Sequence, residues 1–301
     1  MKKIFLIFQV FLLIYAVLFM IGIDFSKTNN IFGIEQVMSI VILLLFHFFR
    51  ALRLRKIVKL YIQEFSIKDA LFLYYIGLAF AIVTPGRVGE VYRIKLLHEK
   101  KISYQKAWEI FILEKYTDLI ALSTFLLFSV VSILFKDLNS FFILLSIILI
   151  SIFGIYLIFF FSKKFSERSN FFKKKNIAIK IIEFFSRFFA IHCIDIVKIY
   201  IETFLGWILF LLALWVGISS VYILSLYELI NVHILNSAAV SLPISYMGYG
   251  LREFFLNSFM FNNSSEMFYI AVITIQFTIF YFFSVLIGLF MYFYKILKKR
   301  I

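Results

Sequence analysis

One ten-residue segment combines helix breakers with charged side chains. It reads Thr84-Pro85-Gly86-Arg87-Val88-Gly89-Glu90-Val91-Tyr92-Arg93 and follows an apolar run. Pro85 lacks the backbone donor that a continuing helix needs, and Gly86 and Gly89 permit tight turns and the close approach of a ligand. The pattern therefore predicts a broken helix whose turn is formed by Pro85, Gly86 and Gly89.

The charged residues of this segment are suited to binding a phosphate. Arg87 and Arg93 can donate charge-assisted, bidentate hydrogen bonds to phosphate oxygens, and Glu90 lies three residues from each and can pair with either. We expect a helix that begins near Val88 to add free N–H groups and the positive end of its dipole. The alternative is a Pro-Gly turn between membrane helices, whose charged side chains extend to lipid headgroups.

A second segment, late in the chain, repeats this order of features. It begins with Pro243, the other of the chain's two prolines, continues with Gly248 and Gly250 around a turn, and enters a helix at Arg252 and Glu253. One interpretation is a cavity wall that matches the first segment, with Arg252 and Glu253 contacting the substrate. The other is an outer loop that carries a surface ion pair.

Three ionisable residues, Glu114, Lys115 and Asp118, lie within an otherwise apolar run. Glu114 and Asp118 are four residues apart and share one helix face. Charged groups inside a membrane are costly and usually face a cavity or a partner, so these carboxylates can balance Arg87 or Arg93, or meet a cationic headgroup or a proton. The alternative is that the segment still lies at the membrane interface, with Lys115 extending to the headgroups.

The composition identifies the environment in which these residues act. The chain has 301 residues, of which 63% are apolar, whereas soluble domains have about 45–50%. It is therefore predicted to be an all-α polytopic membrane protein. The net charge of +14 then marks the cytoplasmic side and attracts anionic lipid at the basic loops, and we expect no nucleic-acid partner.

Few residues are available for metal or redox chemistry. Cys193 is the only cysteine, and the four histidines are scattered without the spacing of metal ligands, so neither a metal nor another cofactor is expected. His47, beside two phenylalanines, is interpreted as a packed polar residue. Trp207 and Trp215 are interpreted as interfacial anchors or lipid-facing side chains.

Eight apolar segments are expected to form the membrane domain. Six are long enough to cross a bilayer, and two are short and end at the prolines. The six long segments are Ile4–Ile23, Val37–Phe49 (beginning near Ile31), Ala107–Phe135, Ser140–Phe161, Tyr200–Leu224 and Met267–Tyr294, and the two short ones are Ala70–Thr84 and Leu226–Leu242.

The short run Ala70–Thr84 is too short to cross. As a helix it is about 22 Å long, less than the hydrocarbon thickness of about 30 Å. If it crossed, the basic stretch Gly86–Lys106 would lie outside, so we expect an element that enters from the cytoplasm and returns. Non-helical backbone at membrane depth is tolerated inside protein or against a water-filled cavity, so Pro85–Gly89 should line a cavity.

The distribution of Lys and Arg predicts the orientation. The basic segments Arg50–Asp69, Gly86–Lys106 and Ser162–Ile199, together with both termini, are assigned to the cytoplasm, and 162–199 is expected to include an amphipathic helix on the membrane surface. On the outer side there remain only Lys27, Lys136 and Arg252. The protein is therefore expected in the cell (inner or cytoplasmic) membrane with cytoplasmic N- and C-termini.

Two broken elements, one entering from each face, are typical of inverted repeats, whose binding sites lie near the midplane. We interpret 1–301 as a single membrane domain. Its possible repeat halves are 1–161 and 200–301, joined by the basic segment 162–199.

Three motifs occur in the order found in one known family. They are T-P-G-R-V-G-E-V-Y-R-x-x-L-L at Thr84–Leu97, E-K-x-x-D at Glu114–Asp118, and a late Pro followed by G-x-R-E, ending at Glu253. In these the chain resembles the lysylphosphatidylglycerol synthetase transmembrane family of flippase-like proteins, over nearly its whole length. Two departures are Lys115, where the family usually has Arg, and Met247–Gly250, where it typically has Gly-Gly-x-Gly.

The resemblance implies lipid translocation or an unknown membrane role rather than lysyl transfer, because the chain ends at Ile301 without the soluble aminoacyl-transferase domain. The predicted function is a lipid flippase or transporter that moves a phospholipid or lipid-linked headgroup through a polar intramembrane cavity. The alternatives are a membrane-embedded transferase and a non-catalytic accessory subunit beside an envelope-biosynthesis enzyme.

Overall fold

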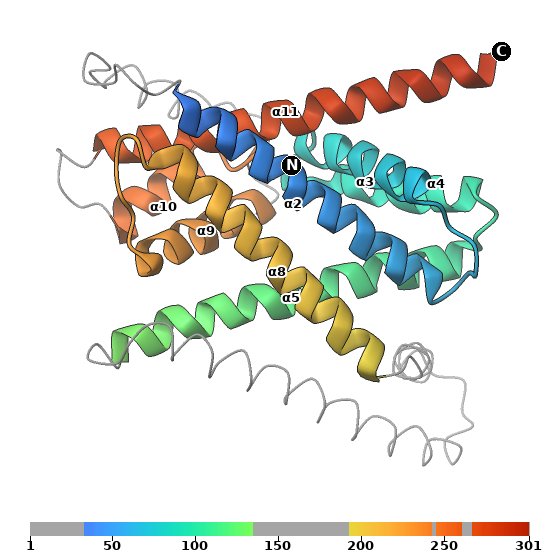
Figure 1. Cartoon of the computed structure of the whole chain (residues 1–301), viewed down its shortest axis with the longest axis horizontal. Helices are drawn as coiled ribbons and strands as arrows, with labels where there is room; N and C mark the ends of the chain where they lie inside the picture. The colour runs from blue at the N-terminus through green and yellow to red at the C-terminus, as the bar shows by residue number, and fades with distance from the viewer. Residues whose placement is uncertain (1–32, 135–192, 243–244, 261–266, 301) are drawn as a thin grey trace, which may run out of the picture.

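The computed structural model describes residues 33–134, 193–242, 245–260 and 267–300, and these are helical without a strand among them (Figure 1). The elements are α2 (Ile34–Lys59), α3 (Ile67–Ile82), the 3-10 helix η2 (Pro85–Val91), α4 (Tyr92–Glu99), α5 (Tyr104–Leu134), α8 (Cys193–Ile218), α9 (Leu226–Ser241), α10 (Leu251–Phe259) and α11 (Met267–Arg300). The predicted all-α class is confirmed. The predicted spans Ile4–Ile23 and Ser140–Phe161, and Pro243, lie outside the described residues.

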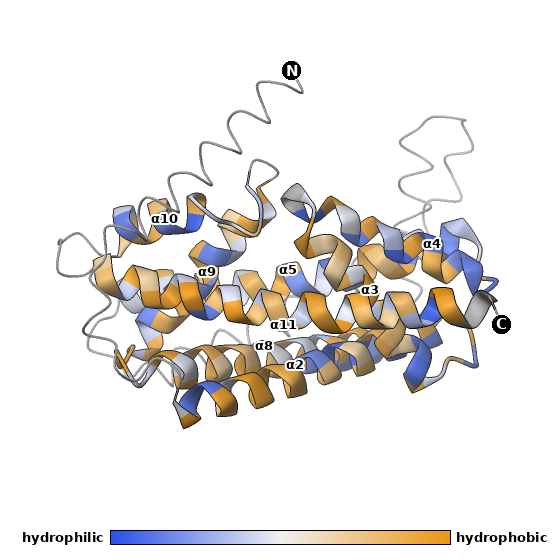
Figure 2. Cartoon of the chain, turned by 90° about the horizontal axis from the view of Figure 1, so that it is seen from above, coloured by the Kyte–Doolittle hydropathy of each residue, from blue (hydrophilic) through white to orange (hydrophobic). Residues whose placement is uncertain are grey.

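Four of these helices are long enough to cross a bilayer. α2, α8 and α11 are also apolar enough to do so, and Figure 2 shows hydrophobic residues along most of their length. α5 has 31 residues, about 46 Å of helix, but it carries Glu114, Lys115 and Asp118. The protein is a helical membrane protein in which one long helix contributes charges to the interior.

The described helices form two sets with the same order and nearly the same lengths. α2 and α8 have 26 residues each, α3 and α9 have 16 each, α4 and α10 have 8 and 9, and α5 and α11 have 31 and 34. Figure 1 shows α2 and α8 side by side and running in opposite directions. Each set also packs on the other, because α5 contacts α9 and α11 contacts α3.

Hydrogen bonds as well as apolar contacts stabilise the packing of α2 against α8. Gln36 Nε2 donates to the Gly217 carbonyl at 2.7 Å, and Ser39 Oγ donates to the Ala213 carbonyl at 2.6 Å. Such side-chain to backbone hydrogen bonds are a usual means of holding helices together in a membrane, where apolar contact alone gives little specificity.

Local sequence signals set the bounds of α3 and of the break that follows it. Ser66 caps the helix by accepting a hydrogen bond from the Asp69 N–H at 3.0 Å. At the other end, Thr84 Oγ1 donates to the Phe80 carbonyl at 2.8 Å and accepts from the Gly89 N–H at 2.7 Å. A Cβ at Gly89 would lie 2.1 Å from the Phe80 carbonyl oxygen, so only glycine permits this close fold of η2 onto α3.

One expectation about this break is wrong. No α-helix begins near Val88: η2 runs from Pro85 to Val91 and continues into α4 at Tyr92. The Arg87 N–H already donates to the Thr84 carbonyl at 3.2 Å, and the Gly89 N–H donates to the same residue's hydroxyl. These amides are therefore used within the turn and are not free to bind a phosphate.

The second break has the predicted glycine turn. Ser225 and Glu228 form a capping box at the start of α9. Gly248 and Gly250 have φ angles of 80° and 81°, a backbone conformation that glycine adopts at little cost. The Gly250 N–H donates to Glu253 Oε2 at 2.6 Å, which fixes the start of α10 at the predicted Arg252-Glu253 pair.

Two predicted boundaries are corrected. The second span does not end at Phe49, because α2 continues to Lys59 and takes in the first half of the predicted basic loop Arg50–Asp69. α8 begins at Cys193 rather than at Tyr200, so the end of 162–199 belongs to a long helix and not to a surface helix. In α2 the charged residues Arg50 and Arg53 find a partner inside the protein, Asp118 of α5.

Candidate functional site

A cavity of about 540 Å³ lies between the two sets of helices. Its walls come from α2, α3, η2, α5, α8, α9 and α11, and α9 contacts η2 across it. Val88 and Leu119, at its edge, are 64% and 60% exposed, so the cavity opens at the outside of the molecule between η2 and α5. The expectation that the first break lines a cavity is met by Thr84, Arg87, Val88 and Glu90.

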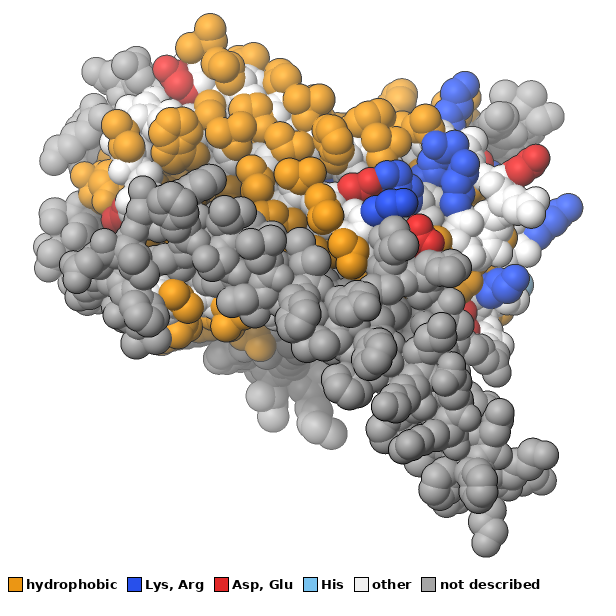
Figure 3. All heavy atoms as spheres, turned by 60° about the horizontal axis from the view of Figure 1, so that its bottom comes forward, with side chains coloured by type: hydrophobic (Ala, Val, Ile, Leu, Met, Phe, Trp, Pro, Cys, Tyr) orange, Lys and Arg blue, Asp and Glu red, His pale blue; other side chains and the backbone are white. Residues whose placement is uncertain are grey.

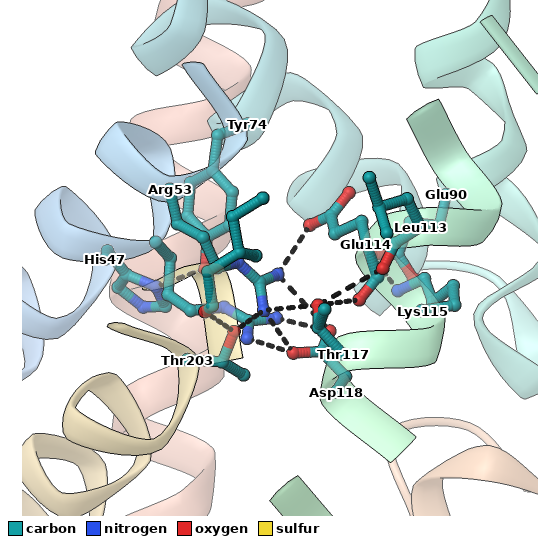
Figure 4. Close-up of polar contacts among 12 residues, drawn as sticks. His47, Arg53, Tyr74, Glu90, Leu113, Glu114, Lys115, Thr117, Asp118 and Thr203 are labelled. Atoms are coloured by element: carbon teal, nitrogen blue, oxygen red, sulfur yellow. Dashed lines mark hydrogen bonds and ion pairs between the residues drawn. The ribbon is translucent and has the colours of Figure 1, made fainter. Parts of the chain in front are cut away.

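Eight charged side chains form one connected cluster beside this cavity, part of which Figure 4 shows. Five are cationic and three are carboxylates, and each is within ion-pair distance of at least one other member. In order of contact they are Arg50, Asp118, Arg53, Glu114, Arg93, Glu90, Arg87 and Lys115. We call this set the charge cluster.

Arg53 lies at the centre of the charge cluster and is 1% exposed. It donates to Asp118 Oδ1 at 2.7 Å, to Glu114 Oε1 at 3.2 Å and to Thr203 Oγ1 at 2.9 Å. In Figure 4 its guanidinium points from α2 toward α5, with Thr203 of α8 below. One side chain thus joins three helices.

Arg93 connects the broken element to α5. Its Nη1 donates to both oxygens of Glu114 at 2.8 and 2.7 Å, and its Nη2 lies 3.2 Å from Glu90. A Cβ at Gly77 would lie 2.2 Å from Arg93 Nε, so the absence of a side chain on α3 makes room for the guanidinium. Arg93 and Glu114 are buried behind the cavity wall and do not line it.

Arg87, Lys115 and Glu90 form the part of the charge cluster nearest the cavity mouth. Lys115 Nζ lies 2.6 Å from Glu90 Oε1, and Arg87 Nε lies 3.6 Å from Glu90 Oε2. Their side chains are 35% and 36% exposed, in contrast to the buried guanidinium groups behind them. Arg87 also has a φ of 58°, a left-handed conformation that costs a non-glycine residue about 1–2 kcal/mol.

Aromatic side chains line another part of the cavity, among them Phe46, Trp207 and Phe210. The Arg50 guanidinium lies 5.1 Å from the Trp207 ring, which corrects the interpretation of Trp207 as an interfacial anchor. His233 packs on Trp207 at 4.7 Å between ring centroids. Both His233 nitrogens and Trp207 Nε1 are buried and lack a hydrogen-bond partner among the described residues.

His47 is held differently from His233. Its Nδ1 is 2.9 Å from the Tyr74 hydroxyl and its Nε2 is 2.8 Å from the Ser284 hydroxyl. The interpretation of His47 as a packed polar residue is therefore confirmed, although it also lines the cavity.

The second motif forms a separate buried ion pair. Arg252 and Glu253 are both 0% exposed, and Arg252 Nη2 lies 2.9 Å from Glu253 Oε1, so the alternative of a surface ion pair is wrong. Arg252 Nη1 also donates to Asn236 Oδ1 at 3.4 Å. Asn236 lines the cavity, whereas Arg252 and Glu253 support it from behind.

The structure brings five of the predicted binding residues into one cluster. Arg87, Glu90 and Asp118 line the cavity, while Arg93 and Glu114 anchor them. The predicted balance of Arg93 by a carboxylate of α5 is confirmed by Glu114. Asp118, in contrast, pairs with two residues that the sequence reading placed in a cytoplasmic loop.

Those two residues, Arg50 and Arg53, were missed as members of the site. Arg50 donates to Asp118 through both Nη atoms, the second at 2.7 Å, and Arg53 donates to the same carboxylate. A signal was present in the sequence, because arginines three residues apart share a helix face and follow directly on an apolar run. Within the described ranges, no group of three or more His, Cys, Asp or Glu converges as metal ligands do.

Comparison with protein families agrees with the motifs. Residues 5–288 match the family described as the lysylphosphatidylglycerol synthase TM region. The chain belongs to this family. It is therefore a membrane protein of a lipid-related family, as its resemblance predicted. No curated protein and no solved structure gave a significant match.

Proposed function

We propose that this protein binds a lipid in the cavity between η2 and α9 and moves its headgroup from one leaflet to the other. The observation that carries the proposal is the composition of the cavity wall. Charged side chains of the charge cluster line one part of it, and aromatic and aliphatic side chains make up much of the remaining wall. A lipid has the same two parts, and its headgroup needs a polar path through the hydrocarbon region.

An inverted repeat supplies a mechanism for access from both sides. The two sets of helices match in order and length, α2 and α8 run in opposite directions, and the breaks in both sets adjoin the cavity. In transporters of this kind, one repeat rocks against the other around a fixed site. Among the described residues we assign the repeats to 34–134 and 193–300, so the second repeat begins seven residues earlier than expected from sequence.

We also assign the orientation. Charged side chains gather in Figure 3 toward the end at which α2 ends and α8 begins. The exposed Lys56, Lys59 and Lys100 belong to that end, where the sequence of α11 also finishes with Lys295 and further basic residues. By the excess of Lys and Arg, this end faces the cytoplasm of the cell membrane and meets anionic lipid there.

Transbilayer movement can be measured directly. Purified protein is reconstituted into vesicles that contain a trace phospholipid with a fluorescent acyl chain, and the outer leaflet is then bleached with dithionite. We expect protein-free vesicles to lose about half of the signal and protein-containing vesicles to lose nearly all of it, because the protein exchanges the leaflets. Bleaching that stops at one half in both would sink the proposal.

A matched pair of variants on α5 ties the movement to the cavity. Leu119 and Leu126 are both exposed, at 60% and 51%, but only Leu119 lines the cavity. Leu119→Trp should slow the second phase of bleaching about tenfold or more by filling the mouth, since an added ring occupies a large part of the opening. Leu126→Trp should match the unaltered protein, and equal slowing by both would point to a general effect of the bulky side chain.

A further inference from the structure

The charge cluster does not balance its own charge. Its cations are Arg50, Arg53, Arg87, Arg93 and Lys115, and its carboxylates are Glu90, Glu114 and Asp118. Two positive charges therefore have no counterpart within the cluster. In the other half of the molecule Arg252 and Glu253 pair one to one, so the excess belongs to one side of the cavity only.

Three arginines of the charge cluster also have an unused hydrogen-bond donor. The Nε–H groups of Arg50, Arg53 and Arg93 are buried and have no acceptor among the described residues. Arg50 lines the cavity, with a side chain that is only 7% exposed. A buried donor without an acceptor is costly, and an anion in the cavity would give the Arg50 Nε–H the acceptor that it lacks, whereas Arg53 and Arg93 lie behind the cavity wall.

On these two observations, and on the proposed function, we propose that the ligand's headgroup is a dianionic phosphate monoester, bound at the mouth between Arg87, Lys115 and Arg50. A phosphate monoester carries about −1.5 to −2 at neutral pH, which matches the excess of the cluster. Arg87 and Lys115 are the cations within reach of the opening, since their side chains are partly exposed and share the single carboxylate of Glu90.

The apolar part of the cavity assigns this phosphate to a lipid rather than to a free ion. The wall also includes Leu43, Phe46, Leu122 and Phe210, which offer apolar contact to an acyl or prenyl chain and none that inorganic phosphate could use. The same charge excess disfavours lysylphosphatidylglycerol, the lipid in the family's description. The amino groups of its lysyl ester would face the cations Arg87 and Lys115.

Lipid preference can be measured without any transport. Purified full-length protein is equilibrated in mixed micelles with equal amounts of phosphatidic acid, phosphatidylglycerol, phosphatidylcholine and lysylphosphatidylglycerol, and bound lipid is counted by native mass spectrometry. We expect phosphatidic acid to exceed phosphatidylcholine roughly tenfold, as charge-assisted hydrogen bonds give, with phosphatidylglycerol between them and the lysyl lipid lowest. Equal occupancy, or a preference for the lysyl lipid, would overturn the proposal.

Two variants with opposite expected effects separate charge from folding. Lys115→Gln should lower the preference for phosphatidic acid about fivefold, whereas Glu90→Gln should raise it by a similar factor, because each changes the charge at the mouth by one unit in opposite directions. Lys100→Gln removes an exposed cation that pairs with Asp69 away from the cavity, and should change nothing. Shifts in the same direction for both test variants would contradict the proposal.

A competition arm distinguishes a lipid phosphate from free phosphate. Inorganic phosphate at the concentration of the phosphatidic acid should not displace it, and equal competition would reject the lipid part of the proposal. The binding measurement and the leaflet-exchange measurement test the two proposals separately. Leaflet exchange without a headgroup preference would reject only the proposal that the headgroup is a dianionic phosphate. A headgroup preference without leaflet exchange would reject only the proposal that the protein moves lipid.

Discussion

At the scale of the residue, the charge cluster is costly for the stability of a membrane protein. Arg53, Arg93 and Glu114 are each 1–2% exposed, and removing such charges from water costs several kcal/mol per ion before their pairing repays it. Apolar residues of similar volume would often be as stable or more so. A cluster of this kind therefore indicates a role beyond holding helices together, which is the role in lipid binding proposed above.

The two buried histidines offer a direct test of which polar groups support the fold. His47 has partners for both nitrogens, and His233 has none among the described residues. We expect His233→Phe to raise the free energy of unfolding by about 1–2 kcal/mol, since an unpartnered polar group is removed, and His47→Phe to lower it by a similar amount, since it removes two buried hydrogen bonds. Thermal unfolding in detergent without added lipid measures both.

Loss of stability in His233→Phe would instead show that this ring is satisfied in the lipid-free protein. A water in the cavity is the simplest partner it could then have. The pair is matched in residue type, substitution and burial, so a general intolerance of phenylalanine would lower both variants alike.

At the scale of the element, close backbone packing adds to apolar contact in positioning the first broken helix. A Cβ at Gly288 on α11 would lie 2.4 Å from the Tyr75 carbonyl oxygen on α3. That contact lets a long helix of one repeat press against the short helix of the other, which brings η2 to the cavity. Small residues at helix crossings have this function in membrane proteins generally.

Replacement of Gly288 by alanine should therefore separate α11 from α3. We expect Gly288→Ala to lower the melting temperature by several degrees, because the neighbour it meets is backbone and cannot move aside cheaply. Gly206→Ala is the matched control, since its Cβ would lie 3.8 Å from the nearest atom, and it should be neutral or stabilising by up to about 1 kcal/mol through helix propensity. An equal fall in melting temperature for both variants would show that the close contact between Gly288 and α3 is not the cause.

At the scale of the whole molecule, the two sets of helices place loops with different properties at opposite ends. The turn after α4 carries Lys100 and Lys101, whereas the turn after α8 carries Val221, Tyr222 and Ile223. Figure 1 shows these turns at opposite ends of the molecule. If the basic end faces the cytoplasm, the other end is exposed on the outer surface.

Thiol labelling in intact cells tests this orientation. In a Cys193→Ser background, Ile223→Cys should react with a membrane-impermeant maleimide and Lys100→Cys should react only after the cells are opened. Both native side chains are well exposed, at 73% for Ile223 and 52% for the Lys100 side chain, so the difference reports the side of the membrane and not burial. The reverse pattern would overturn the orientation.

Much of the fold follows from local properties of the sequence. Apolar runs long enough to cross a bilayer, two prolines that end short runs, and glycines after them locate α3, α9 and both breaks to within a few residues. Glu90 and Arg93 pair as their helical spacing predicts, because that contact lies within one segment. The membrane class follows from composition alone.

Only the tertiary structure decided which charges meet. Arg50 and Arg53 read as the start of a basic loop, because a sequence does not reveal that Asp118, 68 and 65 residues away, stands opposite them. The excess of two positive charges likewise emerges only when α2, η2 and α5 are brought together. Sequence determined the elements because bilayer thickness and backbone chemistry act locally, whereas the site's charge depends on partners that only packing brings within reach.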